Sequence, residues 1–356
     1  MHSPPNNESL NTSTPFNQNA PDEGQYNGAS FSSLDQLAPE LSSLEKDLSF
    51  LLRYDNYHSL SQVDIPHALR ADFISPTSDE PLESSLGGLE KLLAEGHFLL
   101  AANLCGTILT SSLISPTDVK VIFALFHTRL ACLELSGNTI IAAQESKALE
   151  DLSSTFYYVE PEQKADADDP QSNYARHIAP WPLRVLAIRL QSIGFSDPRR
   201  SIGGLYEIGL EARREILRPD IDPAEREIWK QRLSDLGVRT VNALIEMGDL
   251  SAAKRSLASL TNTKPADEAT KLRAVLLLLS IGDVDAARHL CDGLPETGDA
   301  VFKPLLSMSD GRYDDAVGEW RSLLDNKGRE VDYAILCQNL AVCLLYTGQL
   351  SEVFSR

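Results

Sequence analysis

The sequence predicts an all-α protein built from helical hairpins stacked one after another. Hydrophobic residues make up 42% of the 356 residues, but aromatic residues make up only 7%, so Leu, Ala, Val and Ile must form the core. From about residue 83 onward, apolar residues recur at helical spacing, and no segment alternates as a half-buried strand does. A short glycine-to-alanine pattern also recurs between the apolar stretches.

The recurring pattern is a glycine followed five residues later by an alanine. We expect the glycine to end one helix in the left-handed conformation, which it adopts at little cost. We expect the alanine to lie where two helices cross closely, because a larger side chain would push them apart. A further glycine, Gly348, is followed at the same distance by Val353. The five matching pairs are Gly96 and Ala101, Gly137 and Ala142, Gly248 and Ala253, Gly282 and Ala287, and Gly311 and Ala316.

The spacing of these glycines suggests a repeat. Successive glycines lie 29 to 41 residues apart, except for an interval of 111 residues between Gly137 and Gly248. Helical hairpins that recur about every 34 residues are typical of tetratricopeptide repeats. The sequence therefore predicts a tetratricopeptide-like α-solenoid over residues 83–356, with longer, degenerate hairpins in residues 155–245. The alternative is a non-repetitive helical bundle in which the glycines merely end helices.

Residues 1–33 have a different composition. They are rich in Asn, Ser, Pro, Thr and Gly and hold few large apolar residues, so we expect a disordered N-terminal tail. Residues 55–82 contain Pro66, Pro76 and Pro81 and are predicted to be a linker. At the other end, the last unit stops just after Gly348, whereas a solenoid normally ends in a polar capping helix. We therefore expect the repeat domain to be truncated at its C-terminus.

Residues 34–54 carry leucines at alternating intervals of three and four residues. This spacing predicts a helix with leucines along one face. The helix either packs on its own domain, docks on a partner or forms a short coiled coil. The leucines are Leu34, Leu37, Leu41, Leu44, Leu48 and Leu51.

The formal net charge of −19 limits the possible partners. Such a surface repels phosphate backbones and anionic lipids, so we expect no nucleic-acid binding, whereas a protein with a basic face remains a possible partner. The longest apolar runs, Ala274–Leu279 and Leu340–Tyr346, are too short to cross a bilayer. The N-terminus has no secretory pattern, and the five cysteines form no C-x-x-C pair. These features predict a cytoplasmic protein with reduced thiols and no direct membrane insertion.

No constellation typical of catalysis is present. The sequence has no phosphate-binding G-x-x-x-x-G-K-[ST] loop and no G-x-S-x-G elbow, and its seven histidines are dispersed. Asp166, Asp168 and Asp169 resemble half of a calcium loop, but the glycine and the final glutamate are missing. We therefore predict a protein that is not an enzyme, with no catalytic residue, no cofactor and no metal site.

Three segments carry a resemblance to a known family. Trp181 and Arg184, within Ile178–Leu190, lie in a stretch that resembles the W-x-x-R-V-L segment of the family of subunit 12 of the transport protein particle (TRAPP) complex. Asn339–Gly348 is similar to the A-V-C-L-L-Y-x-G signature of the same family, and Ile228–Leu233 also resembles it. The resemblance covers roughly residues 85–356. Its signature residues here are Trp181, Arg184, Trp229, Asn339, Cys343 and Tyr346.

The resemblance implies a tetratricopeptide scaffold or adaptor subunit of a membrane-tethering complex. That complex acts in ER-to-Golgi transport and autophagy and activates a Rab-family GTPase, by nucleotide exchange that belongs to other, smaller subunits. The expected partners are other TRAPP-type subunits, with peripheral association to ER and Golgi membranes through the complex. The family continues through further helices where this chain ends. The alternative function is a chaperone or signalling adaptor that binds peptide tails in a tetratricopeptide groove.

Overall fold

The computed structural model describes residues 35, 37, 46–61, 63, 65, 67, 81–159, 176–219, 221–262, 268–291, 296–327 and 333–349. These residues are mostly α-helical, and adjacent helices pack against each other, which confirms the predicted all-α class. The tail predicted over residues 1–33 lies outside the described residues, as do Asp166, Asp168 and Asp169.

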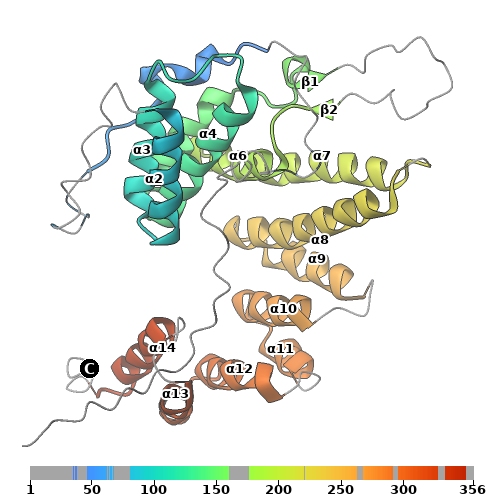
Figure 1. Ribbon diagram of the computed structural model, residues 1–356. Coiled ribbons are helices and arrows are strands. Elements are labelled where there is room, and N and C mark those ends of the chain that lie inside the picture. The colour runs from blue at the N-terminus through green and yellow to red at the C-terminus, as the bar shows by residue number, and fades with distance from the viewer. Residues whose placement is uncertain are drawn as a thin grey trace, which may run out of the picture.

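The α-helices follow one another along the chain, and the longest connection, from α5 to α6, carries the two short strands β1 and β2 (Figure 1). They are α2 (Leu82–Ala94), α3 (Phe98–Thr110), α4 (Val119–Leu135), α5 (Thr139–Glu145), α6 (Trp181–Gly194), α7 (Pro198–Ile216), α8 (Pro223–Glu246), α9 (Leu250–Asn262), α10 (Glu268–Ile281), α11 (Val284–Cys291), α12 (Glu296–Ser309), α13 (Tyr313–Lys327) and α14 (Tyr333–Tyr346).

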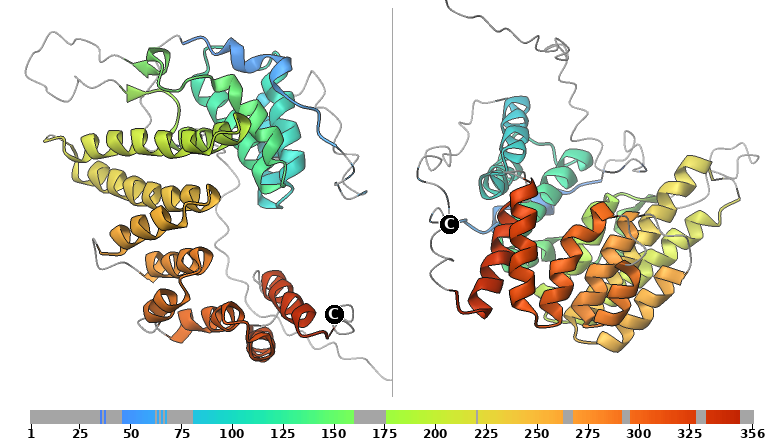
Figure 2. Two further views of the ribbon diagram at one scale, coloured as in Figure 1. Left: turned by 180° about the vertical axis from the view of Figure 1, so that it is seen from behind. Right: turned by 90° about the horizontal axis from the view of Figure 1, so that it is seen from below.

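The helices form an open arc. Helices α2 to α6 gather at the blue-to-green end, and α7 to α14 then stack in chain order along the rest of the arc (Figures 1 and 2). From α2 to α14, each helix packs on the next one along the chain. The main contacts that skip a helix join α4 with α6, α8 with α10, and α10 with α12. Packing between helices is therefore local in sequence along the arc.

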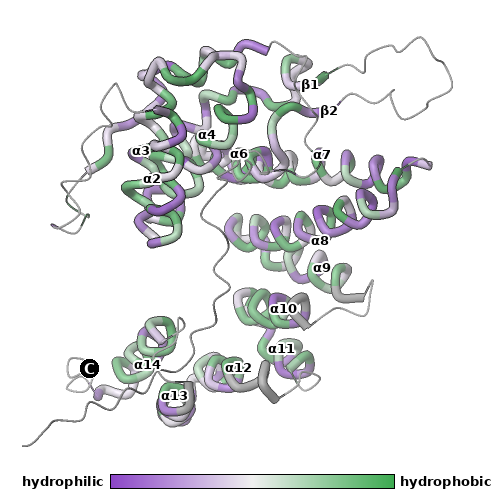
Figure 3. The backbone as a smooth tube through the Cα atoms, in the orientation of Figure 1, coloured by the Kyte–Doolittle hydropathy of each residue, from purple (hydrophilic) through white to green (hydrophobic). Residues whose placement is uncertain are grey.

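The hydrophobic core is correspondingly divided into successive clusters. The largest lies among α2 to α6, the next joins α6, α7 and α8, and three further clusters follow along α8 to α14. Figure 3 shows hydrophobic and hydrophilic residues alternating along α7 and α8, as expected for amphipathic helices that bury one face. Each helix pair thus buries its own share of apolar surface.

The turns between helices show the geometry that glycine favours. Gly96, Gly137, Gly248, Gly282, Gly311 and Gly348 have φ between 75° and 86°. The alanine five residues after each of the first five glycines is fully buried. At two of these turns the following aspartate caps the next helix, because Oδ1 of Asp249 accepts from the N–H of Ala252 at 2.9 Å and Oδ1 of Asp283 accepts from that of Ala286 at 3.3 Å.

The stretch predicted to hold longer hairpins contains the two longest of the described helices. Helix α7 has 19 residues and α8 has 24. Helix α8 begins with Pro223, and the Asp222 carboxylate accepts from the N–H groups of Ala224 at 2.9 Å and Glu225 at 3.3 Å. Proline fits the first position of a helix because that residue needs no amide donor.

The prediction of one continuous helix over residues 34–54 is wrong for residues 46–54. There the chain forms the 3₁₀ helix η1 (Ser49–Leu52) and enters a second, η2 (Tyr54–Asn56). Leu48 and Leu51 are fully buried in the first cluster, and the N–H of Leu48 donates to the carbonyl of Pro116 at 2.9 Å. A spacing of three residues fits a 3₁₀ turn as well as an α-helix. Leu34, Leu41 and Leu44 lie outside the described residues.

The first part of the predicted linker packs against the helical domain. Leu60 is buried in the first cluster, and Tyr57 packs against the same cluster. The backbone N–H of His58 donates to Oε1 of Glu145 at 2.8 Å. Residues 57–60 therefore belong to the packed structure, and Pro66 and Pro76 lie outside the described residues.

A small antiparallel ladder departs from a purely helical expectation. Strand β1 (Tyr158–Val159) pairs with β2 (Arg176–His177), so that Tyr158 faces His177 and Val159 faces Arg176. Because each strand has only two residues, the ladder offers too few positions for an alternating pattern to be visible in the sequence. It holds residues 158 and 176 close to the start of α6.

Candidate functional site

A pocket of about 410 Å³ opens where the β1–β2 ladder meets α6, α7 and α8. Its walls combine aromatic rings with many charged groups. The lining residues are Asp35, Leu37, Tyr158, Arg176, His177, Ala179, Trp181, Arg184, Glu211, Arg214, Glu215, Arg218, Glu225, Trp229 and Arg232. Its volume lies within the range of small-ligand pockets.

Two tryptophans pack together in the wall of the pocket. The rings of Trp181 on α6 and Trp229 on α8 meet edge to face, with centroids 5.4 Å apart and an interplanar angle of 90°. The guanidinium of Arg232 lies 4.5 Å from the Trp229 centroid and 5.0 Å from that of Trp181. A cation over an aromatic face is attracted by the ring quadrupole, so the two rings hold Arg232 in place.

Arg184 joins the first turn of α6 to α7. Its two terminal nitrogens donate to the two carboxylate oxygens of Glu211, and the Nη1–Oε1 distance is 2.8 Å. Burial raises the pKa of Glu211, but the hydrogen bonds and charge of Arg184 outweigh it and hold the pKa below its usual value. Such a two-pronged pair fixes orientation as well as charge, so Arg184 positions the α6–α7 wall of the pocket.

Asp35 reaches this pocket from 146 residues upstream of Trp181. Its Oδ2 accepts a hydrogen bond from the backbone N–H of Trp181 at 2.9 Å, and its other oxygen pairs with Arg232. The residue before α6 is Pro180, which supplies no side-chain cap. Asp35 therefore takes the place of a local N-cap and also neutralises Arg232.

His177 is held as a neutral group beside the pocket. Its Nδ1 accepts from the N–H of Ala179 at 3.0 Å, and its Nε2–H donates to the carbonyl of Leu152 at 2.9 Å. Burial, followed by the nearby charge of Arg184, lowers the pKa of His177 to about 4. Since both ring nitrogens bond to the backbone, His177 anchors β2 to the domain.

Two arginines of the pocket stand apart from the others. Arg184, Arg218 and Arg232 each pair with a carboxylate. Arg176 and Arg214 are exposed and form no ion pair within the part of the chain that the structure describes. Among the described residues, the pocket thus has two exposed guanidinium groups outside its ion pairs, beside its aromatic rings, an arrangement that suits carboxylates or other anions.

Only part of the family signature converges on this pocket. Trp181, Arg184 and Trp229 all line it. Cys343 and Tyr346 lie on α14, at the opposite end of the arc (Figure 1). There Tyr346 stacks on Tyr313 with centroids 4.4 Å apart, and burial raises the pKa of the fully buried Cys343 thiol.

Asn339 also lies on α14, where it is half-buried. Of the signature residues on α14, Cys343 is buried in the last hydrophobic cluster, and none of the three lines the pocket. The glycines and alanines of the repeated turn lie at helix junctions along the arc, and none of them lines the pocket.

The sequence alone does not point to three further residues of the pocket: Arg232, Glu211 and Asp35. Arg232 falls inside Ile228–Leu233, a segment that carries the family resemblance. Glu211 meets Arg184 across 27 residues, and Asp35 meets Arg232 across 197. No local spacing indicates contacts of that range.

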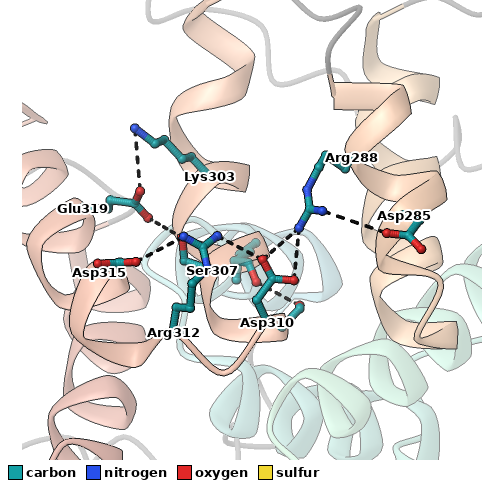
Figure 4. Close-up of polar contacts among 10 residues, drawn as sticks. Asp285, Arg288, Lys303, Ser307, Asp310, Arg312, Asp315 and Glu319 are labelled. Atoms are coloured by element: carbon teal, nitrogen blue, oxygen red, sulfur yellow. Dashed lines mark hydrogen bonds and ion pairs between the residues drawn. The ribbon is translucent and has the colours of Figure 1, made fainter.

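A second polar cluster lies at the Gly311 turn (Figure 4). Asp310 accepts from Nη2 of Arg288 at 2.8 Å and from Nη2 of Arg312 at 2.9 Å, and these charges, Arg312 first, lower the pKa of its carboxyl. Arg312 also pairs with Asp315 at 3.1 Å. The charged groups drawn in Figure 4 are paired with one another, so the cluster ties α11, α12 and α13 together and offers no vacant group.

Other kinds of site receive no support from the described residues. Within those ranges no three His, Cys, Asp or Glu side chains gather as metal ligands. In the same ranges, every helix is too short or too polar to cross a bilayer. Comparisons with protein-family models, with curated proteins and with solved structures give no match for this chain.

Proposed function

We propose that the chain is a tetratricopeptide-like α-solenoid that acts as a non-enzymatic scaffold. The observation that carries the proposal is the repeated turn, in which six glycines have φ near 80° and five are followed by a fully buried alanine. Packing between consecutive helices and the division of the core into successive clusters also support it. In a solenoid each repeat contacts only its neighbours, which leaves a long surface for partners.

The proposed role is that of an adaptor subunit in a TRAPP-type tethering complex. The resemblance at Trp181, Arg184 and Trp229 supports this role, because these three residues build one pocket and not scattered parts of the core. The adaptor links subunits of a Rab GTPase exchange assembly, and the exchange chemistry belongs to the other subunits. In this proposal the protein works in the cytoplasm, bound to early secretory membranes through its complex.

Affinity purification tests the proposed complex. The tagged full chain is expressed in cells, purified at physiological salt, and its partners are identified by mass spectrometry. We expect other tethering subunits in the eluate, together with nucleotide exchange on a Rab GTPase that the chain alone does not catalyse. A tetratricopeptide protein of similar length and charge, carrying the same tag, is the control. Recovery of the chain as a monomer without tethering subunits would overturn the proposal.

The arginines of the pocket favour one alternative, a chaperone or signalling adaptor that grips peptide tails. Repeat proteins of that kind bind a C-terminal carboxylate with basic side chains, and five arginines line this pocket. An EEVD-ended peptide separates the two functions. Binding that disappears when the peptide's C-terminus is amidated would favour the tail-binding adaptor.

A further inference from the structure

The residues at positions 35 and 37 occupy the aromatic pocket as a bound peptide would. The Asp35 side chain is only 7% exposed, and that of its partner Arg232 is 11% exposed. Oδ1 of Asp35 also accepts from the N–H of Leu37 at 2.9 Å, which turns the backbone so that Leu37 packs with the cluster around Trp181 and Trp229. One acidic group and one apolar group, two residues apart, therefore enter the pocket together.

The groups that receive Asp35 come from the solenoid itself. They are the N–H of Trp181, which has no partner within α6, and the guanidinium of Arg232, which lies over both tryptophan rings. A helix N-terminus carries partial positive charge, and a buried guanidinium adds a full charge. Without a carboxylate, this end of the pocket would hold an unpaired buried cation. The site is therefore built for an acidic side chain.

The pocket is larger than Asp35 and Leu37 require. These two side chains are part of its lining, and about 410 Å³ of open space remains beside them. That space borders Tyr158 and the exposed Arg176 and Arg214, neither of which forms an ion pair with another described residue. On a chain of net charge −19, a concave surface with five arginines against four carboxylates attracts acidic groups.

We propose that the pocket binds a short acidic segment of a partner protein, in which an Asp or Glu precedes an apolar residue by two positions, and that Asp35 and Leu37 are a built-in competitor. The partner's first acidic group replaces Asp35 on Arg232 and on the N–H of Trp181. Its apolar residue replaces Leu37, and neighbouring acidic residues meet Arg176 and Arg214. The inference rests on the proposed scaffolding function, since it names the surface and the partner chemistry.

Fluorescence anisotropy with labelled peptides tests the site on the full chain. The first probe is FSSLDQLAPEL, the sequence of residues 31–41, and its partner FSSLNQLAPEL lacks the key carboxylate. A third, DDSLDQLDDEL, carries extra acids on both sides of the same core. The chain is used in its natural form and as an opened variant, Asp35→Asn with Leu37→Ala. A tethered competitor acts at high effective concentration, so we expect the opened variant to bind the first probe at least about tenfold more tightly.

Charge reversal tests the arginines. Arg214→Glu and Arg176→Glu remove the groups that meet further acidic residues, so the third probe should lose at least about threefold in affinity for the opened variant. Arg213→Glu is the matched control, because Arg213 is the exposed neighbour of Arg214 on α7 and does not line the pocket. If the opened variant does not fold, as judged by circular dichroism, the same two reversals in the natural chain give the comparison.

The outcomes decide the proposal in either direction. It is overturned if the opened variant binds the first probe no more tightly than the natural chain, or if the asparagine probe binds equally well. It is also overturned if Arg213→Glu weakens binding as much as Arg214→Glu, since the attraction would then be a property of the whole surface. These results do not depend on the purification experiment. The chain can bind the peptide without recovering tethering subunits, and it can recover tethering subunits without binding the peptide.

Discussion

Arg129 and Glu145 form an ion pair that is almost wholly removed from solvent. Nε and Nη2 of Arg129 donate to the two oxygens of Glu145 at 2.6 Å each, and the side chains are 2% and 0% exposed. Arg129 also donates to the carbonyls of Ala102 at 2.7 Å and His58 at 3.0 Å. One guanidinium therefore ties α4 to α3, to α5 and to the segment before α2.

Replacing Glu145 with alanine should destabilise the N-terminal helices severely. The substitution leaves Arg129 buried and unpaired, which costs about 3–5 kcal/mol. Urea unfolding measures the loss. Glu134→Ala is the control, because Glu134 pairs with the half-exposed Arg189 and such surface pairs are worth at most about 1 kcal/mol. Equal effects of the two substitutions would contradict the role assigned to the buried pair.

The glycine turns can be tested with two glycines that have the same open space at Cβ but different backbone conformations. Gly282 and Gly203 both have open space where a Cβ would lie, but only Gly282 has a positive φ, of 86°. Gly282→Ala should therefore cost about 1–2 kcal/mol through left-handed strain. Gly203→Ala, within α7, should stabilise the protein by about 0.5–1 kcal/mol because alanine favours helices. Thermal melts of the two variants should move in opposite directions, and a shift of the same sign in both would refute the argument.

The turns were predictable because their chemistry is local. Gly282 needs only its own backbone freedom, and the Asp283 carboxylate caps the N–H of Ala286, three residues on. Both signals lie within one short window of sequence. The same holds for Asp222 and Pro223 at the start of α8.

The pocket was predictable only in part, because its contacts are long-range. The family resemblance points to Trp181 and Trp229, but the hydrogen bond from the N–H of Trp181 to Asp35 spans 146 residues. Asp35 stood within a leucine stripe that indicated a helix, and its charge carried no local signal. At Leu48 and Leu51 the helix prediction failed because a three-residue interval also fits the 3₁₀ turn of η1.

Ala287 should tolerate little growth. It is fully buried in the cluster that joins α10, α11 and α12, and a leucine there would force neighbouring side chains or helices apart. We expect Ala287→Leu to cost about 1–3 kcal/mol by overpacking. Ala334→Leu, at an exposed position of α14, adds the same side chain where nothing is displaced and should change stability little. Chemical denaturation of both variants measures the difference, and an unchanged midpoint for Ala287→Leu would rule out a close helix crossing there.

Acid should destabilise the protein partly through His177. Burial and the charge of Arg184 hold its folded-state pKa at about 4, against an ordinary value of 6.5. Between these values the unfolded chain binds a proton that the folded chain excludes. The stability that His177 contributes is therefore complete above pH 6.5 and is lost as the pH falls from 6.5 towards 4. The half-buried His127, whose pKa is also lowered to about 4, acts in the same direction.

The variant His177→Gln isolates this contribution. Glutamine stays neutral, and its amide offers one acceptor and one donor for the N–H of Ala179 and the carbonyl of Leu152. The natural chain should lose about 1 kcal/mol through His177 between pH 7.5 and pH 5.5, a window above the ordinary titration range of most carboxylates. Urea unfolding at the two pH values should show that the variant loses about 1 kcal/mol less free energy of unfolding than the natural chain. An identical pH dependence in both proteins would mean that His177 gains its proton without unfolding, and hence that its two backbone bonds do not hold it neutral.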